Sequence, residues 1–429
     1  MSVASGALEE VVSAPRTARA GRPLRVLQVI ASVADVNGGA STAIWATLKA
    51  LRSQGIHSDL VTTNEDGPHR MMDVTTGEFV DHGGHRVLFF PYRGDRYTTS
   101  WPLARWLFEH VRDYDLIHVH GLFRFAPVVA AHIALARGVP YVLTLHNTLG
   151  QWGLQHKRRL LKKLSIGLVE GRVLDRASKV HLCSAHELSE VSRIRALGAR
   201  SRVFPLGIDL HDETAAGACS SEGAGDLQAL AGQPVILFMS RIHEIKGVDK
   251  LLVAFAGVRR VRPDALLAIA GTGTEQLVAS LRGSARKLGI EDYTHWLGFV
   301  QGQRKRELLS RATVFVLPSH SENFGYATVE AMAAGLPVIT TVNVPSGKFV
   351  TEADAGIVYD GSAERLEQSI VQILNMPEDE RRLLGARGAF TVTERLSLRT
   401  FGDCLERTYR EAVEINSPEP QQSSHRLAP

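Results

Sequence analysis

The chain has 429 residues, of which 44% are hydrophobic and 22% charged, a composition typical of a globular protein with room for two or three domains. Its 49 basic and 45 acidic residues leave a net charge of +4, which is too small a surplus to indicate a nucleic-acid partner. The widely spaced Cys183, Cys219 and Cys404 argue against a structural zinc and for a reducing compartment. Glu9 and Glu10 interrupt the N-terminus where a signal peptide would be apolar, and no apolar run could span a bilayer, so we expect a cytoplasmic protein.

Residues 1–22 are small, polar and aperiodic, and we expect them to be disordered. Residues 23–212 then alternate short apolar runs with helical segments, which predicts a parallel sheet covered by helices on both faces. The expected strands are residues 24–30, 59–62, 87–90, 116–119, 141–144 and 179–182. Residues 213–232 are rich in Ala, Gly and Ser and predict a linker.

Residues 233–395 repeat the same alternation and predict a second sheet of the same kind. Its expected strands are residues 234–238, 266–269, 295–297, 314–317, 338–339 and 356–358. A helical period occupies residues 396–415, and the tail, residues 416–429, is rich in Pro, Gln and Ser and is expected to be loose. The predicted fold is α/β, with two doubly wound, Rossmann-like domains whose facing carboxyl edges form a central cleft.

The most informative stretch is residues 319–340, which follow a predicted buried strand. Polar residues as far as Gly325 predict a loop, and a helix is expected from about Ala327. Loop N–H groups and the positive end of a helix dipole favour an anionic ligand. Glu322 and Glu330 flank this point, and a carboxylate accepts hydrogen bonds from adjacent hydroxyls of a sugar or ribose. A single glutamate here would be read as a solvated acid, but the pair favours a ligand site.

A second loop of this kind follows the strand at residues 234–238. Arg241 offers a bidentate fork and Lys246 a point charge, and both suit a departing diphosphate, although a solvated basic turn is the alternative. In the first domain, Gly38 and Gly39 follow the first strand and would let the backbone approach a phosphate, although such turns are common.

The two glutamates have seven residues between them, including Asn323, Phe324 and Gly325, and this pattern resembles the signature of retaining glycosyltransferases of the GT-B fold, group 1 or family four. The resemblance implies that Glu322 holds hydroxyls of the donor sugar and that Glu330 holds the ribose of the nucleotide. It also implies that Asn323 is donor-binding, and that the backbone amides of Phe324 and Gly325 meet the sugar and phosphate.

The resemblance covers nearly the whole chain from the first strand to the last helix. It implies that Arg241 and Lys246 hold the donor diphosphate, with Ser240 where the family usually has glycine. Gly38 and Gly39 match the family's phosphate-approaching loop. The family's last helix crosses back onto the first domain, and we expect the same here.

Histidines end two strands of the first domain. His146 matches the family's functional histidine close to the reacting sugar, where it would donate to a sugar hydroxyl or a phosphate oxygen; a core or capping histidine is the alternative. His120 is expected to line the acceptor side, and His118 to be packed. Val300 is expected to touch the nucleotide base through its backbone, near the loop at residues 271–273.

Two motifs are rejected. Asp113-Tyr114-Asp115 has the form of a metal-binding Asp-x-Asp but precedes a strand, so we interpret it as a turn. Gly271-Thr272-Gly273 lacks the third glycine of a dinucleotide fingerprint. The resemblance implies a nucleotide-diphosphate sugar as co-substrate and no other cofactor or metal.

The resemblance implies a retaining enzyme that moves a hexose-type sugar to a hydroxyl acceptor, such as a polysaccharide, exopolysaccharide, lipopolysaccharide or lipid-linked glycan intermediate. The second domain would bind the donor and the first the acceptor. A GT-B epimerase and a non-catalytic binding subunit are the alternatives. The basic stretch at residues 155–164 is either a solvated helix face or a contact with an anionic membrane, which leaves peripheral attachment at the cytoplasmic face open.

Overall fold

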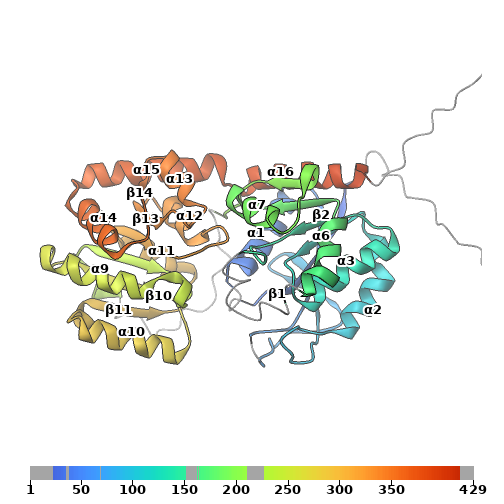
Figure 1. Ribbon diagram of the computed structural model, residues 1–429, viewed down its shortest axis with the longest axis horizontal. Coiled ribbons are helices and arrows are strands. Elements are labelled where there is room, and N and C mark those ends of the chain that lie inside the picture. The colour runs from blue at the N-terminus through green and yellow to red at the C-terminus, as the bar shows by residue number, and fades with distance from the viewer. Residues whose placement is uncertain are drawn as a thin grey trace, which may run out of the picture.

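The computed structural model describes residues 23–34, 38–67, 69–150, 162, 164–209 and 227–415. The expected disordered N-terminus and loose tail lie outside these residues, as do most of the linker predicted at residues 213–232 and most of the basic stretch at residues 155–164. Two lobes lie side by side (Figure 1), each built on one sheet.

The first lobe contains an eight-stranded sheet with the order β3-β4-β2-β1-β5-β6-β7-β8. Its strands are β1 (Arg25–Ser32), β2 (His57–Thr63), β3 (Phe79–His82), β4 (His85–Phe90), β5 (Leu116–His120), β6 (Tyr141–Thr144), β7 (Lys179–Leu182) and β8 (Ser201–Val203). All neighbouring pairs run parallel except β3 and β4. The central strands are buried along most of their length, as expected for strands covered on both faces.

In the described part of the first lobe the α-helices are α1 (Gly39–Ser53), α2 (Trp101–His110), α3 (Phe125–Arg137), α6 (Gly171–Arg176), which follows a π-helix (Ile166–Glu170), and α7 (Ala185–Ser192). They cover both sides of the sheet and close the core around the buried apolar strands (Figure 1).

The second lobe contains a six-stranded, wholly parallel sheet with the order β11-β10-β9-β12-β13-β14. Its strands are β9 (Val235–Met239), β10 (Leu266–Ala270), β11 (Thr294–Gly298), β12 (Val314–Leu317), β13 (Val338–Thr341) and β14 (Gly356–Tyr359). Its helices are α9 (Val248–Val261), α10 (Glu275–Lys287), α11 (Gly302–Arg311), α12 (Tyr326–Ala333), α13 (Gly347–Glu352), α14 (Ala363–Asn375) and α15 (Glu378–Arg395). The prediction of two doubly wound domains is confirmed.

The segment at residues 64–86, which has no apolar run, contains a strand that the sequence analysis missed. β3 pairs antiparallel with β4 through a turn at Gly83 and Gly84, whose φ angles are 63° and 80°. Two consecutive positive φ angles are typical of a tight hairpin turn, so the Gly-Gly pair was the available signal.

The last helix, α16 (Leu398–Ile415), leaves the second lobe and packs on α1, β5 and β6 of the first, as the resemblance implied (Figure 1). Two segments of the chain meet just before α16, where the backbone N–H of Ile208 donates to the carbonyl of Leu396. Gly402 lies so close to α1 that an added Cβ would be 3.0 Å from the carbonyl oxygen of Ala50. Glu411 anchors the far end of α16 through ion pairs with Lys179 and Arg202.

Candidate functional site

Two loops of the second lobe meet at the carboxyl ends of β9 and β12. Gly247 has a φ of 68°, and any Cβ there would collide with the carbonyl oxygen of Pro318. Only glycine allows this close approach. The backbone N–H of His320 also donates to the carbonyl of Ile245 at 2.8 Å. The short helix before Gly247 is therefore held against the loop that follows β12.

This contact brings Lys246 and Glu322 together. Their side chains form an ion pair and are 11% and 12% exposed. The hydroxyl of Ser319 donates to the same Glu322 oxygen at 2.9 Å. A lysine and a carboxylate that are shielded from water interact more strongly than an exposed pair. Together they hold two charges in fixed positions beside the loops that follow β9 and β12.

The loop that leads into α12 has a conformation that only glycine fits easily. Gly325 caps the helix with a φ of 91°, and an added Cβ would lie 2.6 Å from the hydroxyl of Ser346. The side chain of Phe324 is 2% exposed and packs edge-on against Phe349. The buried ring anchors the loop, so a ligand can meet only the backbone of Phe324, consistent with the predicted role of its amide.

Glu330 lies on the same helix but has a different partner. Its carboxylate pairs with Lys305 of α11 at 2.6 Å, and the two side chains are 19% and 29% exposed. The structure thus places Glu322 with Lys246, and Glu330 with Lys305, on one face of the second lobe. No motif in the sequence marked Lys305 as a partner of Glu330.

Gly38 and Gly39 of the first lobe lie against residues of the second lobe. An added Cβ at Gly38 would be 3.0 Å from Nε of Arg241, and one at Gly39 would be 3.9 Å from the ring of Tyr326. Arg241 itself is exposed. The structure therefore brings together the glycine pair of the first lobe and the basic loop of the second, as the resemblance implied.

A hollow of about 460 Å³ adjoins the basic loop at the ends of β10 and β11. Ile242, Trp296, Arg282 and the loop at residues 271–273 are among its lining residues. Gly271 and Gly273 lie directly against the backbone carbonyls of residues 240 and 242, where a Cβ would not fit. Val300 is 8% exposed and follows β11 at this side of the lobe.

His146 follows β6 in an unusual backbone conformation. His146 and Asn147 have φ angles of 49° and 57°. The carboxylate of Glu187 stabilises this turn, because it accepts hydrogen bonds from the backbone N–H groups of Asn147 and Cys183, both at 2.7 Å. Burial raises the pKa of Glu187 to about 7.

Nothing in the sequence pointed to this role of Glu187. The only local signal is a helix cap, in which Ser184 accepts a hydrogen bond from the backbone N–H of Glu187 at the start of α7. A Ser-x-x-Glu sequence is the usual signal for a helix start, so it gave no reason to expect a contact with the turn at residue 146.

The prediction that His120 lines the acceptor side is wrong. His120 is 3% exposed, and both ring nitrogens are hydrogen-bonded, one to His146 at 3.0 Å and the other to Gln28 at 2.8 Å. His118 is 1% exposed, which confirms that it is packed. Residues two apart on a strand share a face, and α16 covers this face of β5.

The interpretation of Asp113-Tyr114-Asp115 as a turn is confirmed: Asp113 ends a single turn of 3₁₀ helix (Val111–Asp113), and the backbone N–H of Tyr114 donates to the carbonyl of Val111. Within the residues that the structure describes, no group of three or more His, Cys, Asp or Glu side chains is arranged to hold a metal ion.

Two family descriptions match this chain, Glycosyltransferase Family 4 over residues 37–212 and Glycosyl transferases group 1 over residues 225–388. The chain belongs to the group 1 and family 4 glycosyltransferases. Among relatives in these families, the glycogen synthase of Mycobacterium tuberculosis is 30% identical over 246 residues, which are 57% of this chain. The match spans 56% of the glycogen synthase, little more than half its length. The phosphatidyl-myo-inositol mannosyltransferase of Mycobacterium leprae is 25% identical over 79% of this chain and 84% of its own.

The fold of this glycosyltransferase resembles that of the sucrose-phosphate synthase of Thermosynechococcus elongatus, with a TM-score of 0.71 and 21% identity. The superposition covers 92% of this chain and all of the synthase. It extends over both lobes, so the two-lobed GT-B architecture is shared.

Proposed function

We propose that this chain transfers a hexose-type sugar from a nucleotide-diphosphate sugar to a hydroxyl acceptor with retention at the anomeric carbon. The observation that carries the proposal is the shielded pair of Glu322 with Lys246, on the same loop as Arg241, which lies against Gly38 of the first lobe. Two cations near one glycine-lined backbone suit a diphosphate, and a neighbouring carboxylate suits sugar hydroxyls.

Each part of the donor has a place in this arrangement. Lys246 and Arg241 hold the diphosphate, and Glu322 with the amides of the residue 323–325 loop holds the sugar. Glu330 binds the ribose once Lys305 turns aside, and the hollow beside residues 271–273 and Val300 takes the base. The cations replace a metal at the leaving group, so no cofactor other than the donor is needed.

The acceptor binds against the first lobe, and closure of the lobes completes the site. A leaving phosphate oxygen lies on the same face of the sugar as the incoming hydroxyl and takes its proton as the new bond forms. The acceptor class we propose is a polysaccharide, lipopolysaccharide or lipid-linked glycan intermediate.

A panel of UDP-, GDP- and ADP-sugars tests the proposal by thermal shift. At about 100 times its Kd, the true donor should stabilise the protein by roughly 2.7 kcal/mol, or a few degrees in Tm. The free sugar and the nucleoside monophosphate are the controls, and neither should match the donor. No stabilisation by any member would contradict the proposed donor site.

Product analysis by NMR with the stabilising donor then separates the alternatives. Transfer with the donor's anomeric configuration supports the proposal, whereas an epimerised nucleotide sugar formed without acceptor supports an epimerase. Binding without any product would identify a non-catalytic binding subunit.

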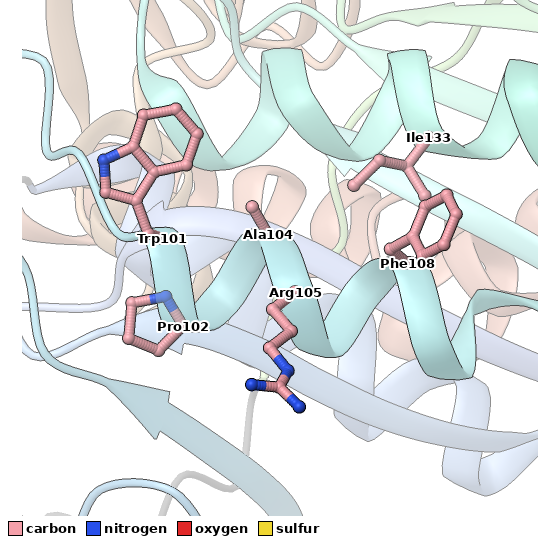
Figure 2. A pocket seen from close by; sticks show the side chains of 6 residues that line it. All are labelled: Trp101, Pro102, Ala104, Arg105, Phe108 and Ile133. Atoms are coloured by element: carbon pink, nitrogen blue, oxygen red, sulfur yellow. The ribbon is translucent and has the colours of Figure 1, made fainter.

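We also propose that one edge of the first lobe docks on an anionic membrane. The surface of α2 and α3 carries a groove of about 660 Å³, and Figure 2 shows its lining, with Trp101 at one end and Phe108 beside Ile133 at the other. Trp101 and Phe108 are 58% and 51% exposed. Arg105 also lines the groove, and the guanidinium of Arg137 lies 4.6 Å from the ring of Phe108.

Further aromatic and apolar side chains lie near this groove. Trp101 packs edge-on against Phe125, and Lys162 lies 5.6 Å from the ring of Phe123 just before α3. Leu164 and Leu168 follow, 59% and 70% exposed. Exposed aromatic residues beside cations are typical of a protein that rests on anionic headgroups. None of the helices that the structure describes is long and apolar enough to cross a bilayer.

Sedimentation with vesicles tests this surface. The double variant Trp101→Ala, Phe108→Ala should bind phosphatidylglycerol vesicles about tenfold or more weakly, because each half-buried aromatic ring contributes on the order of 1 kcal/mol. The matched control is Leu383→Ala, Phe390→Ala on α15, whose side chains are 55% and 69% exposed. Equal binding of both variants, or no binding by the parent protein, would exclude the docking surface.

A further inference from the structure

A continuous chain of buried hydrogen bonds lies beneath His146. It draws side chains from β1, β5, β6, β7 and α16, and beyond His146 each of them is at most 3% exposed. In order, its members are His146, His120, Gln28, Tyr409, His118, Thr144 and His181, and the last of these contacts the backbone carbonyl of Phe204. Successive polar atoms are 2.6 to 3.3 Å apart. We call this chain the histidine relay.

The carbonyl of Phe204 sets the direction of the relay. A carbonyl oxygen only accepts, so the ring nitrogen of His181 that lies 3.0 Å from it, Nε2, carries a proton. Burial lowers the pKa of His181 to about 4, so the ring is neutral at pH 7 and its Nδ1 is an acceptor. The hydroxyl of Thr144, 3.0 Å away, therefore donates to Nδ1.

The direction of the hydrogen bonds is also fixed between Thr144 and α16. Because the only proton of the Thr144 hydroxyl points to His181, its oxygen accepts from Nε2–H of His118 at 2.7 Å. Burial also lowers the pKa of His118, which leaves Nδ1 of this ring as an acceptor. The hydroxyl of Tyr409 donates to that Nδ1 at 2.6 Å. A residue of the returning helix thus occupies the middle of the relay.

Tyr409 then fixes the amide of Gln28. With its proton committed to His118, the Tyr409 oxygen accepts from Nε2 of Gln28 at 3.3 Å. The reverse amide orientation would set two oxygen acceptors against each other where neither reaches water. The Gln28 oxygen therefore faces His120 and accepts from its Nε2–H at 2.8 Å, and Nδ1 of His120 accepts from Nε2–H of His146 at 3.0 Å.

We propose that the histidine relay holds His146 in its Nε2–H tautomer, and that Tyr409 is a positioning residue for this histidine. The remaining nitrogen, Nδ1, carries no proton; it is buried and has no hydrogen-bond partner among the described residues. His146 therefore offers its ligand a lone pair. The identity of this ligand rests on the proposed function: the lone pair accepts a hydrogen bond from a hydroxyl of the bound sugar. A deprotonated phosphate oxygen has no hydrogen to donate.

Long-range ¹H–¹⁵N correlation NMR of the ¹⁵N-histidine-labelled full chain near pH 7 tests the relay directly. His146 is assigned from the signals lost in His146→Gln. The expected spectrum shows a protonated Nε2 and an unprotonated Nδ1 for His146. The measurement needs no nucleotide sugar, so its outcome is independent of whether the proposed activity is correct.

Tyr409→Phe removes the hydroxyl that orients Gln28, and His146 should then change from one tautomer to a mixture of two. The matched control is Tyr141→Phe, which removes another buried hydroxyl, hydrogen-bonded to the carbonyl of Val173, and should leave His146 unchanged. Thr144→Val breaks the relay at a second point and should act like Tyr409→Phe. A proton on Nδ1 of His146 in the parent protein would overturn the proposal. If His146 kept a single, unchanged tautomer in folded Tyr409→Phe, Tyr409 would not be a positioning residue.

Discussion

Replacing Lys246 by methionine is expected to lower the turnover number for sugar transfer by about 10²- to 10³-fold, the usual cost of removing one preorganised charge at a developing anion. The diphosphate gains negative charge as it leaves the sugar, and Lys246 is a shielded cation next to the carboxylate proposed to hold that sugar. Because the interaction strengthens as charge develops, the loss should fall mainly on kcat and less on KM.

The matched control for this variant is Lys49→Met. Lys49 pairs with Asp209 at 2.7 Å, and their side chains are 20% and 22% exposed, so the variant also breaks a partly buried lysine–carboxylate pair. This pair lies in the first lobe and outside the proposed donor site, so kcat should stay within about twofold of the parent. If Lys246→Met retained turnover within threefold, the assignment of Lys246 to the leaving group would be wrong.

Acidification is expected to destabilise the protein steeply between pH 6.5 and about pH 4. Burial depresses the pKa values of His118, His120, His146 and His181 below the ordinary 6.5, to about 3 for His146 and about 4 for His181. The unfolded chain therefore binds more protons in this range, and stability that is complete above pH 6.5 is lost as the pH falls. At pH 5 His146 and His181 each cost about 2 kcal/mol, and His118 and His120 act in the same direction, so the loss is a large part of the stability of a domain.

Glu187 acts in the opposite direction, because its pKa is raised from 4.5 to about 7. The contribution of Glu187 to the free energy of unfolding is complete below pH 4.5 and is lost as the pH rises through 7. At pH 5 it therefore offsets only about 3 kcal/mol of the stability lost through the histidines. Urea midpoints followed by fluorescence from pH 7.5 to pH 5 measure the net result. Glu187→Gln should steepen the dependence by about one proton, and a midpoint that does not fall on acidification would refute the neutral histidine relay.

The sequence located every parallel strand of the second sheet, and every strand but the short β8 among the parallel strands of the first. Most of these strands are buried along most of their length, so they appear as short, mainly apolar runs that need no distant partner to be recognised. β3 has an exposed half and no such run, and only its Gly83-Gly84 turn marked it. The approach of Lys246 to Glu322 was also predictable, since both follow carboxyl ends of parallel strands.

The partners of single side chains were less predictable. Glu330 meets Lys305 because α11 lies beside α12, a packing that no spacing in the chain encodes. The resemblance placed His120 on the acceptor side, but its position depends on which strands the last helix covers.

The amino-acid sequence by itself determined two largely parallel sheets, the charged loops at their carboxyl edges and a final helix, because apolar periodicity and glycine positions act over a few residues. Only the tertiary structure decided that Tyr409, 381 residues after Gln28, completes the relay behind His146. Hydrogen-bond direction depends on which donors and acceptors meet in a buried space, and that is fixed when distant segments pack together.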